Sequence, residues 1–125
     1  MQLRYLPYVL ILVAITGCNR APKALSVEGK QVKPDQTVFA ADGVVACFSS
    51  DDLQQYVALG PQVEKSQLFP LVRDHKCAVF GGGGDHLKVI RIEPIGSVQA
   101  VVASDLDDQT APQIWVKSDQ VSVQD

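Results

Sequence analysis

The second half of this chain is dominated by short runs of β-branched residues, and these runs limit the folds open to it. The runs CAVF, HLKVIRIEPI, SVQAVVAS and QIWVKS all lie between residues 77 and 118. In residues 88–92 apolar and polar side chains partly alternate, which is typical of a strand with one buried face. TVFAADGVVACF, residues 37–48, adds a strand, a turn and a second strand that ends at Cys47. We therefore expect a mainly β fold of short antiparallel strands with tight connections.

One short helix is expected among these strands. In SSDDLQQYVALGP, residues 49–61, a serine can cap the first turn, two aspartates follow it, and a glycine with a proline ends the helix. Leu53, Tyr56 and Val57 fall at helical spacing, so one apolar face should pack on the core. Residues 61–76, PQVEKSQLFPLVRDHK, are interrupted by Pro70 and are predicted as an irregular loop.

The first eighteen residues differ in character from the rest of the chain. They hold one cation, Arg4, and an apolar run from Val9 to Ile15 that is too short for a permanent membrane span and typical of an export signal. The run ends in ITGC, which resembles the lipobox of bacterial lipoproteins. That resemblance implies cleavage before Cys18, a diacylglycerol on its sulfur and an acyl chain on its amine, enough for stable membrane anchoring. A plain signal peptide with an incidental cysteine is the alternative.

The residues after Cys18 suggest a membrane-sorting signal and a flexible tether. Asn19 stands where an aspartate would favour retention, and by the sorting rule of enterobacterial lipoproteins the resemblance implies the periplasmic face of the outer membrane. Residues 18–36 are polar, carry two prolines and have no apolar period, so they are predicted to form a flexible tether about 25 Å long. The predicted organisation is a signal peptide over residues 1–17, this tether, and one domain over residues 37–125.

Two cysteines, Cys47 and Cys77, remain in the mature chain. Export leads to a compartment where thiols oxidise, and a C-x-x-C redox spacing is absent. A structural disulfide is therefore expected rather than a redox dithiol. By the chain-entropy argument, closing a loop of about thirty residues contributes about 3 to 4 kcal/mol to stability.

The order of the predicted strands resembles a known family. Cys77, the glycines of residues 81–84, the two following strands and the closing IWVKSDQV are similar to bacterial SH3-like domains, in which a tryptophan-valine strand precedes one turn of 3₁₀ helix and a last strand. The resemblance covers residues 37–123. It implies a small SH3-like antiparallel barrel, and the short helix expected between the two disulfide-bonded cysteines is a departure from that family. The VR-x-G-P opening of the cell-wall-binding members is missing, so only the fold is carried over.

Charge and the glycine run exclude two classes of ligand. Without Arg4 the chain has ten basic and fourteen acidic residues, a net charge of −4, and nucleic acid is not an expected partner. A phosphate-binding loop needs a helix and a lysine after its glycines, but Gly84 is followed by Asp85 and a strand. The glycines are predicted to form a sharp corner. A mobile loop that closes over a partner is the alternative.

No catalytic residue, metal or cofactor is assigned from the sequence. The motifs G-x-S-x-G and H-E-x-x-H are absent. Asp74 with His75 and Asp85 with His86 are chain neighbours, which point to opposite faces of a strand, so neither pair is expected to act as a unit. SDLDD, residues 104–108, resembles half of a calcium-binding cluster, but the EF-hand register is missing and a solvated turn is expected.

Trp115 is the candidate for contact with a partner. It lies between Ile114 and Val116 on an alternating strand, so it either packs in the core or is exposed opposite those two residues. SH3-like grooves often use aromatic residues to hold extended peptides.

The resulting hypothesis is a membrane-anchored periplasmic lipoprotein that is not an enzyme and that binds an envelope protein or stabilises an envelope assembly. An inhibitor or immunity lipoprotein against a basic cell-wall hydrolase is one alternative, because the net charge is negative. A peptidoglycan-binding module is another.

Overall fold

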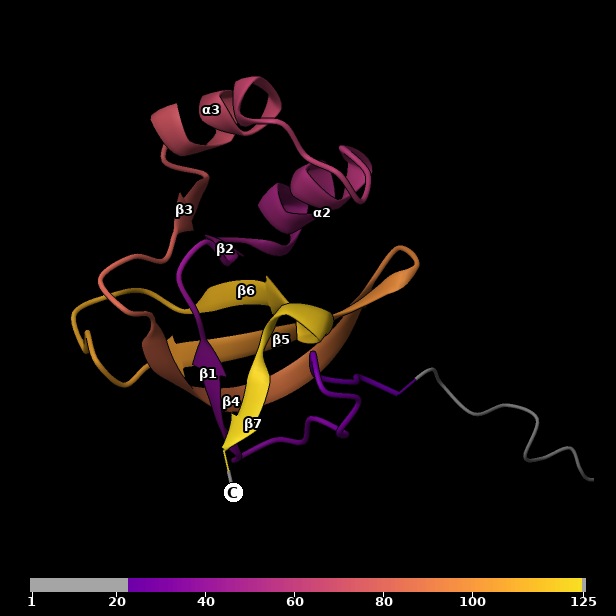
Figure 1. Ribbon diagram of the computed structural model, residues 1–125, viewed down its shortest axis with the longest axis vertical. Helices are drawn as coiled ribbons and strands as arrows, with labels where there is room; N and C mark the ends of the chain where they lie inside the picture. The colour runs from indigo at the N-terminus through magenta and orange to yellow at the C-terminus, as the bar shows by residue number, and fades with distance from the viewer. Residues whose placement is uncertain (1–22, 125) are drawn as a thin grey trace, which may run out of the picture.

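The computed structural model describes residues 23–124, so the predicted signal peptide and Cys18 lie outside the described residues. Seven strands form one antiparallel sheet in the order β3-β2-β6-β5-β4-β1-β7, which confirms the mainly β prediction (Figure 1). The strands are β1 (Thr37–Ala40), β2 (Val45–Cys47), β3 (Cys77–Val79), β4 (Asp85–Ile95), β5 (Val98–Asp105), β6 (Ile114–Lys117) and β7 (Ser122–Gln124).

The long hairpin of β4 and β5 forms the centre of the sheet (Figure 1). Its register shifts between Val89 and Arg91, which leaves Ile90 unpaired opposite β5. Such a bulge bends and twists a strand, and both strands curve strongly in the ribbon view. The bend lets β1 and β7 cross over the same core that β5 and β6 cover from the other side.

The sheet does not close into a barrel. β2 pairs with both β6 and β3, so the outer side of β6 is taken by β2, and β3 and β7 are the two outermost strands. The sequence resemblance did not anticipate this pairing because β2 and β3 are only three residues long and flank the helical insertion.

Two helices, not the single predicted one, lie between β2 and β3. The expected helix is α2 (Ser50–Ala58), and the Ser49 hydroxyl caps it by accepting the backbone N–H of Asp52 at 3.0 Å. The second is α3 (Lys65–Arg73), in the segment predicted as loop. Its first turn is held by Gln67, whose Oε1 accepts the backbone N–H of Glu64 at 3.0 Å. Pro70 removes one helical hydrogen bond, and the cap and the burial of Leu71 offset that loss.

Hydrophobic residues pack on both faces of the sheet. Along β2, Ala46 belongs to one cluster and its neighbours Val45 and Cys47 to another, and successive strand residues point to opposite faces. The first cluster is built on residues from β1, β2, β4, β5, β6 and β7. The second lies beneath the helices and contains Leu53, Tyr56 and Leu71. In Figure 1 both helices lie on one side of the sheet.

The folded domain begins before residue 37, so the predicted tether is too long. Residues 24–32 form a small hairpin, named here the N-terminal hairpin, with a bridge between Leu25 and Gln31. Ala24 and Val32 are 4% and 2% exposed and belong to the first cluster. The backbone N–H of Val27 donates to the Val121 carbonyl at 2.9 Å. The four apolar residues of this segment, at positions 24, 25, 27 and 32, do not repeat at a strand or helix period over its whole length, which is why the sequence did not reveal this hairpin.

Candidate functional site

The predicted disulfide joins Cys47 and Cys77. The two residues face each other in the antiparallel pair of β2 and β3, and both are buried in the second cluster. The bond fixes the two strands from which the helical insertion leaves and returns. Its position is structural.

Trp115 packs beneath the helices. Ile114 and Val116 are 4% and 0% exposed in the first cluster, and Trp115 points to the opposite face, where it is partly buried in the second cluster. The Arg91 guanidinium carbon lies 5.9 Å from the centre of its ring. Its buried Nε1 has no hydrogen-bond partner among residues 23–124. These surroundings favour packing over partner contact, because the helices cover a face that the sequence left open.

The four glycines make a corner next to β1. The Asp42 carboxylate accepts the backbone N–H of Gly83 at 2.8 Å. A Cβ on Gly84 would lie 2.3 Å from the carbonyl oxygen of Ala40, and Gly84 has a φ of +89°. Only glycine fits such a position. The predicted corner accounts for these contacts without any ligand.

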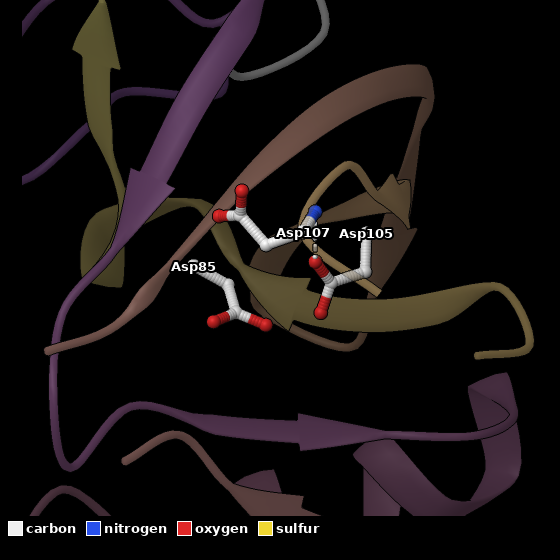
Figure 2. A group of neighbouring side chains, drawn as sticks. All are labelled: Asp85, Asp105 and Asp107. Carbon is white, nitrogen blue, oxygen red and sulfur yellow. Dashed lines mark hydrogen bonds between the residues drawn. The ribbon is translucent and has the colours of Figure 1, made fainter. Parts of the chain in front are cut away.

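Three aspartates meet where β4 begins and β5 ends (Figure 2). Asp85 opens β4, Asp105 closes β5, and Asp107 lies in the turn that follows, with carboxylate oxygens within 4.8 Å of one another. Asp105 is 8% exposed, and its Oδ1 accepts the backbone N–H groups of Asp107 and Asp108 at 2.9 and 3.2 Å. The turn expected over residues 104–108 begins only at Leu106, because Ser104 and the buried Asp105 still belong to β5, and Asp85 joins Asp105 through the pairing of β4 with β5.

Hydrogen bonding shifts the pKa values of Asp85 and Asp107 in opposite directions. The Asp107 carboxylate accepts the backbone N–H of His86 at 2.6 Å and lies 3.1 Å from His86 Nδ1, and these contacts lower the pKa of Asp107. A hydrogen bond to Asp105, together with desolvation and repulsion from the neighbouring aspartates, raises the pKa of Asp85 to about 6. His86 therefore pairs with Asp107 rather than with Asp85, its neighbour in the chain.

The aspartate cluster gives no positive sign of a metal. Asp105 is already bonded to the turn and to Asp85, and Asp107 to His86. In the other Asp-His pair, the Asp74 carboxylate contacts Arg73 Nε at 3.2 Å. The cluster is best explained as a network that fixes the end of the β4–β5 hairpin, and no metal is assigned to it.

A hollow of about 370 Å³ lies beside η3 (Ser118–Gln120), the single 3₁₀ turn between β6 and β7. We name it the η3 groove. Its walls are formed by Val27 of the N-terminal hairpin, the chain from Phe39 to Val44, and β7 at Ser122. Phe39 and Val44, both partly buried, supply apolar surface, and Val44 packs against the first cluster.

Polar groups converge on the η3 groove. Asp42 and Asp119 line it and are exposed. The side-chain oxygen of Gln120 is buried there and has no hydrogen-bond partner within the described part of the chain. An unsatisfied buried acceptor is costly, so a ligand N–H that met this oxygen, once the Gln120 side chain turned toward the groove, would remove that cost. The sequence did not reveal this site, because its residues come from three distant segments that share no motif.

The chain matches no protein-family model, no curated protein and no solved structure. None of the helices within residues 23–124 has the length and the apolar surface that a membrane crossing requires.

Proposed function

We propose that this protein is a lipid-anchored, non-enzymatic binding module of the bacterial envelope, and that its η3 groove holds an extended segment of another envelope protein. The anchor is Cys18 of the lipobox-like ITGC, and Asn19 favours the periplasmic face of the outer membrane. The domain then carries its groove on the periplasmic side.

The observation that carries this proposal is the buried oxygen of Gln120. A main-chain N–H of an extended peptide would satisfy it once the Gln120 side chain turns toward the groove, while Phe39 and Val44 contact the peptide's apolar side chains. Asp42 and Asp119 favour a lysine or arginine in the bound segment. Shallow apolar grooves with a few fixed polar groups are typical of peptide recognition.

The SH3-like character of the fold belongs to the same proposal. Trp115 and Val116 lie on β6, η3 follows as a single turn, and β7 is the last strand, the order that the resemblance implies. Six strands, all except β3, contribute residues to the first hydrophobic cluster. The helical insertion and the pairing of β2 with β6 are departures specific to this chain.

The charge of the groove favours one variant of this function. Residues 34–125 hold six basic and thirteen acidic residues, a net charge of −7, and two of those acidic residues line the groove. A basic partner would be attracted to this surface. A cell-wall hydrolase with a basic active-site cleft is such a partner, and the protein would then act as its inhibitor.

Photo-crosslinking in cells tests the proposal. Benzoylphenylalanine in place of Ala41, which is exposed in the groove, should give a specific protein adduct. The same group at Gln67, exposed on α3, is the matched control and should not give that adduct. Gln120→Met, of similar volume but without the acceptor, should reduce the adduct at residue 41 about fivefold.

The possible results separate the variants of the proposal. An adduct with a cell-wall hydrolase identifies the inhibitor, and an adduct with another envelope protein identifies the assembly module. Equal adducts at residues 41 and 67, or no protein adduct at residue 41, would overturn the groove as the binding site.

A further inference from the structure

The lipidated cysteine and the folded domain are close together in the chain. Four residues separate Cys18 from Lys23, and Ala24 is already held in the domain because its carbonyl accepts the backbone N–H of Val32 at 2.8 Å. Five peptide units span at most about 18 Å when fully extended. If Cys18 is acylated, the N-terminal hairpin must lie within that distance of the lipid surface.

Charge is distributed unequally between this part of the chain and the rest. Residues 19–33 contain four basic residues and one acidic residue, a net charge of +3, whereas residues 34–125 have a net charge of −7. The basic residues are Arg20, Lys23, Lys30 and Lys33. A protein that is acidic overall therefore has its one strongly basic stretch directly after the predicted anchor.

The N-terminal hairpin places two of these charges, Lys23 and Lys33, and an apolar side chain on its outer side. Exposure alternates along the first arm: Lys23 is exposed, Ala24 and Ser26 are each 4% exposed, and Leu25 is 43% exposed. Alternation puts Lys23 and Leu25 on the same, outward side. The backbone hydrogen bond between Val32 and Ala24 pairs the two arms of the hairpin. Lys33 is exposed and follows Val32, so it lies at the same end of the hairpin as Lys23.

The acidic residue of the hairpin is turned away from that side. Glu28 Oε1 accepts the backbone N–H of Val123 at 3.0 Å and is also bonded to the Ser26 hydroxyl. These contacts lower the pKa of Glu28 and hold its charge toward β7. Lys23 and Leu25 also border a hollow of about 220 Å³ with Ser97 of the β4–β5 turn and Gln99 of β5, where Asp119 is the acidic neighbour.

We propose that the outer side of the N-terminal hairpin, formed by Lys23, Leu25 and Lys33, docks on the anionic phospholipid surface of the membrane that holds the Cys18 acyl chains. This inference rests on the lipid anchor of the proposed function. The short connection brings the hairpin to the surface, the lysines contact anionic headgroups, and Leu25 enters the interfacial layer. Docking therefore orients the domain, with the helical insertion on the opposite side of the sheet and away from the lipid (Figure 1).

Charge complementarity and chain length together favour lipid over a protein as the occupant. Any protein partner would have to compete with a bilayer that the anchor keeps within about 18 Å. Phe69 provides the comparison, because it is 60% exposed on α3 and lies beside Arg73, yet it is on the side of the sheet opposite to the hairpin.

The test uses the full-length protein exported by living cells. Radiolabelled palmitate first establishes whether Cys18 is acylated. Benzoylphenylalanine in place of Leu25 should then crosslink to phospholipid, and the same group in place of Phe69 should not. Lys23→Glu with Lys33→Glu should lower the lipid adduct at residue 25 at least about fivefold, while palmitate incorporation stays the same.

Each result has one meaning. Lipid adducts at residue 25 alone, sensitive to the two lysines, support docking. If palmitate is incorporated but residue 25 gives no lipid adduct, gives a protein adduct instead, or reacts no more than residue 69, the docking inference is wrong and the anchored binding module stands. If palmitate is never incorporated, the anchor of the proposed function fails, and docking fails with it.

Discussion

Cys47 and Cys77 face each other across β2 and β3, and a disulfide joins them. The two cysteines are 30 positions apart in the sequence, and both helices lie between them. The bond thus joins the two ends of the helical insertion to the edge of the sheet. Cys47→Ala with Cys77→Ala should lower the free energy of unfolding by about 3 to 4 kcal/mol. Urea denaturation with circular dichroism measures this change.

The loss of stability in the variant without the disulfide should differ between parts of the domain. Hydrogen exchange in the variant should increase first in α2 and α3, because β2 and β3 pair with only three residues each. The β4–β5 hairpin, which has a bonded partner on both sides, is the internal control. Exchange that increases equally in both regions would contradict a local role for the disulfide.

Asp85 makes stability depend on pH. Its pKa is about 6 in the folded protein and 3.8 ordinarily, so between these values the folded state binds more protons than the unfolded state. The contribution of Asp85 to the free energy of unfolding is therefore greatest below about pH 4. It decreases as the pH rises from about 4 to about 6 and stays constant above that. Solvent screens the partly exposed group and keeps the effect small.

Asp85→Asn should remove this slope, because asparagine keeps a donor to Asp105 without the charge. The variant should melt about 2 to 5 °C above the parent protein at pH 7.5 and at the same temperature near pH 4. Thermal melts from pH 4 to 8 measure the difference. Asp74→Asn, at the exposed end of α3, is the control and should keep the parent's slope.

The sequence was sufficient where the pattern was local. Alternating Val and Ile residues, the Ser49 cap and the two cysteines identified the strands, α2 and the disulfide. α3 was missed because Pro70 outweighed the capping residues Glu64 and Gln67 in the sequence. The N-terminal hairpin was missed because its stability comes from a few buried contacts with distant strands rather than from its own pattern.

The site could not be predicted for a similar reason. Asp42, Asp119 and Gln120 become neighbours only when β1 and β7 pair. Their spacing along the chain does not predict that pairing. Trp115 was the natural candidate because it is the single tryptophan, but a sheet with hydrophobic layers on both faces leaves it covered. The sequence revealed only part of the aspartate cluster. Residues 105–108 are adjacent in the chain, but Asp85 joins them only through the register of β4 with β5.

Gly84 should be the least replaceable glycine of the corner. A Cβ at this position would lie 2.3 Å from the Ala40 carbonyl oxygen, and its φ of +89° is strained for any other residue. Gly84→Ala should cost about 2 to 4 kcal/mol of unfolding free energy. Gly81→Ala, where a Cβ meets nothing within 4 Å, should change it by less than about 0.5 kcal/mol. Equal costs at the two positions would show that the close approach to β1 is not what requires glycine.

Trp115 allows packing to be separated from hydrogen bonding and from partner contact. Trp115→Phe keeps an aromatic ring under Arg91 and removes an Nε1–H that has no partner among the described residues, so it should cost less than about 1 kcal/mol. Trp115→Ala leaves a cavity beneath the helices and should cost about 2 to 4 kcal/mol. Urea denaturation followed by circular dichroism compares both variants with the parent. A packing residue also predicts that Trp115→Phe leaves the protein adduct at residue 41 unchanged, and loss of that adduct in a stably folded variant would instead make Trp115 a contact residue.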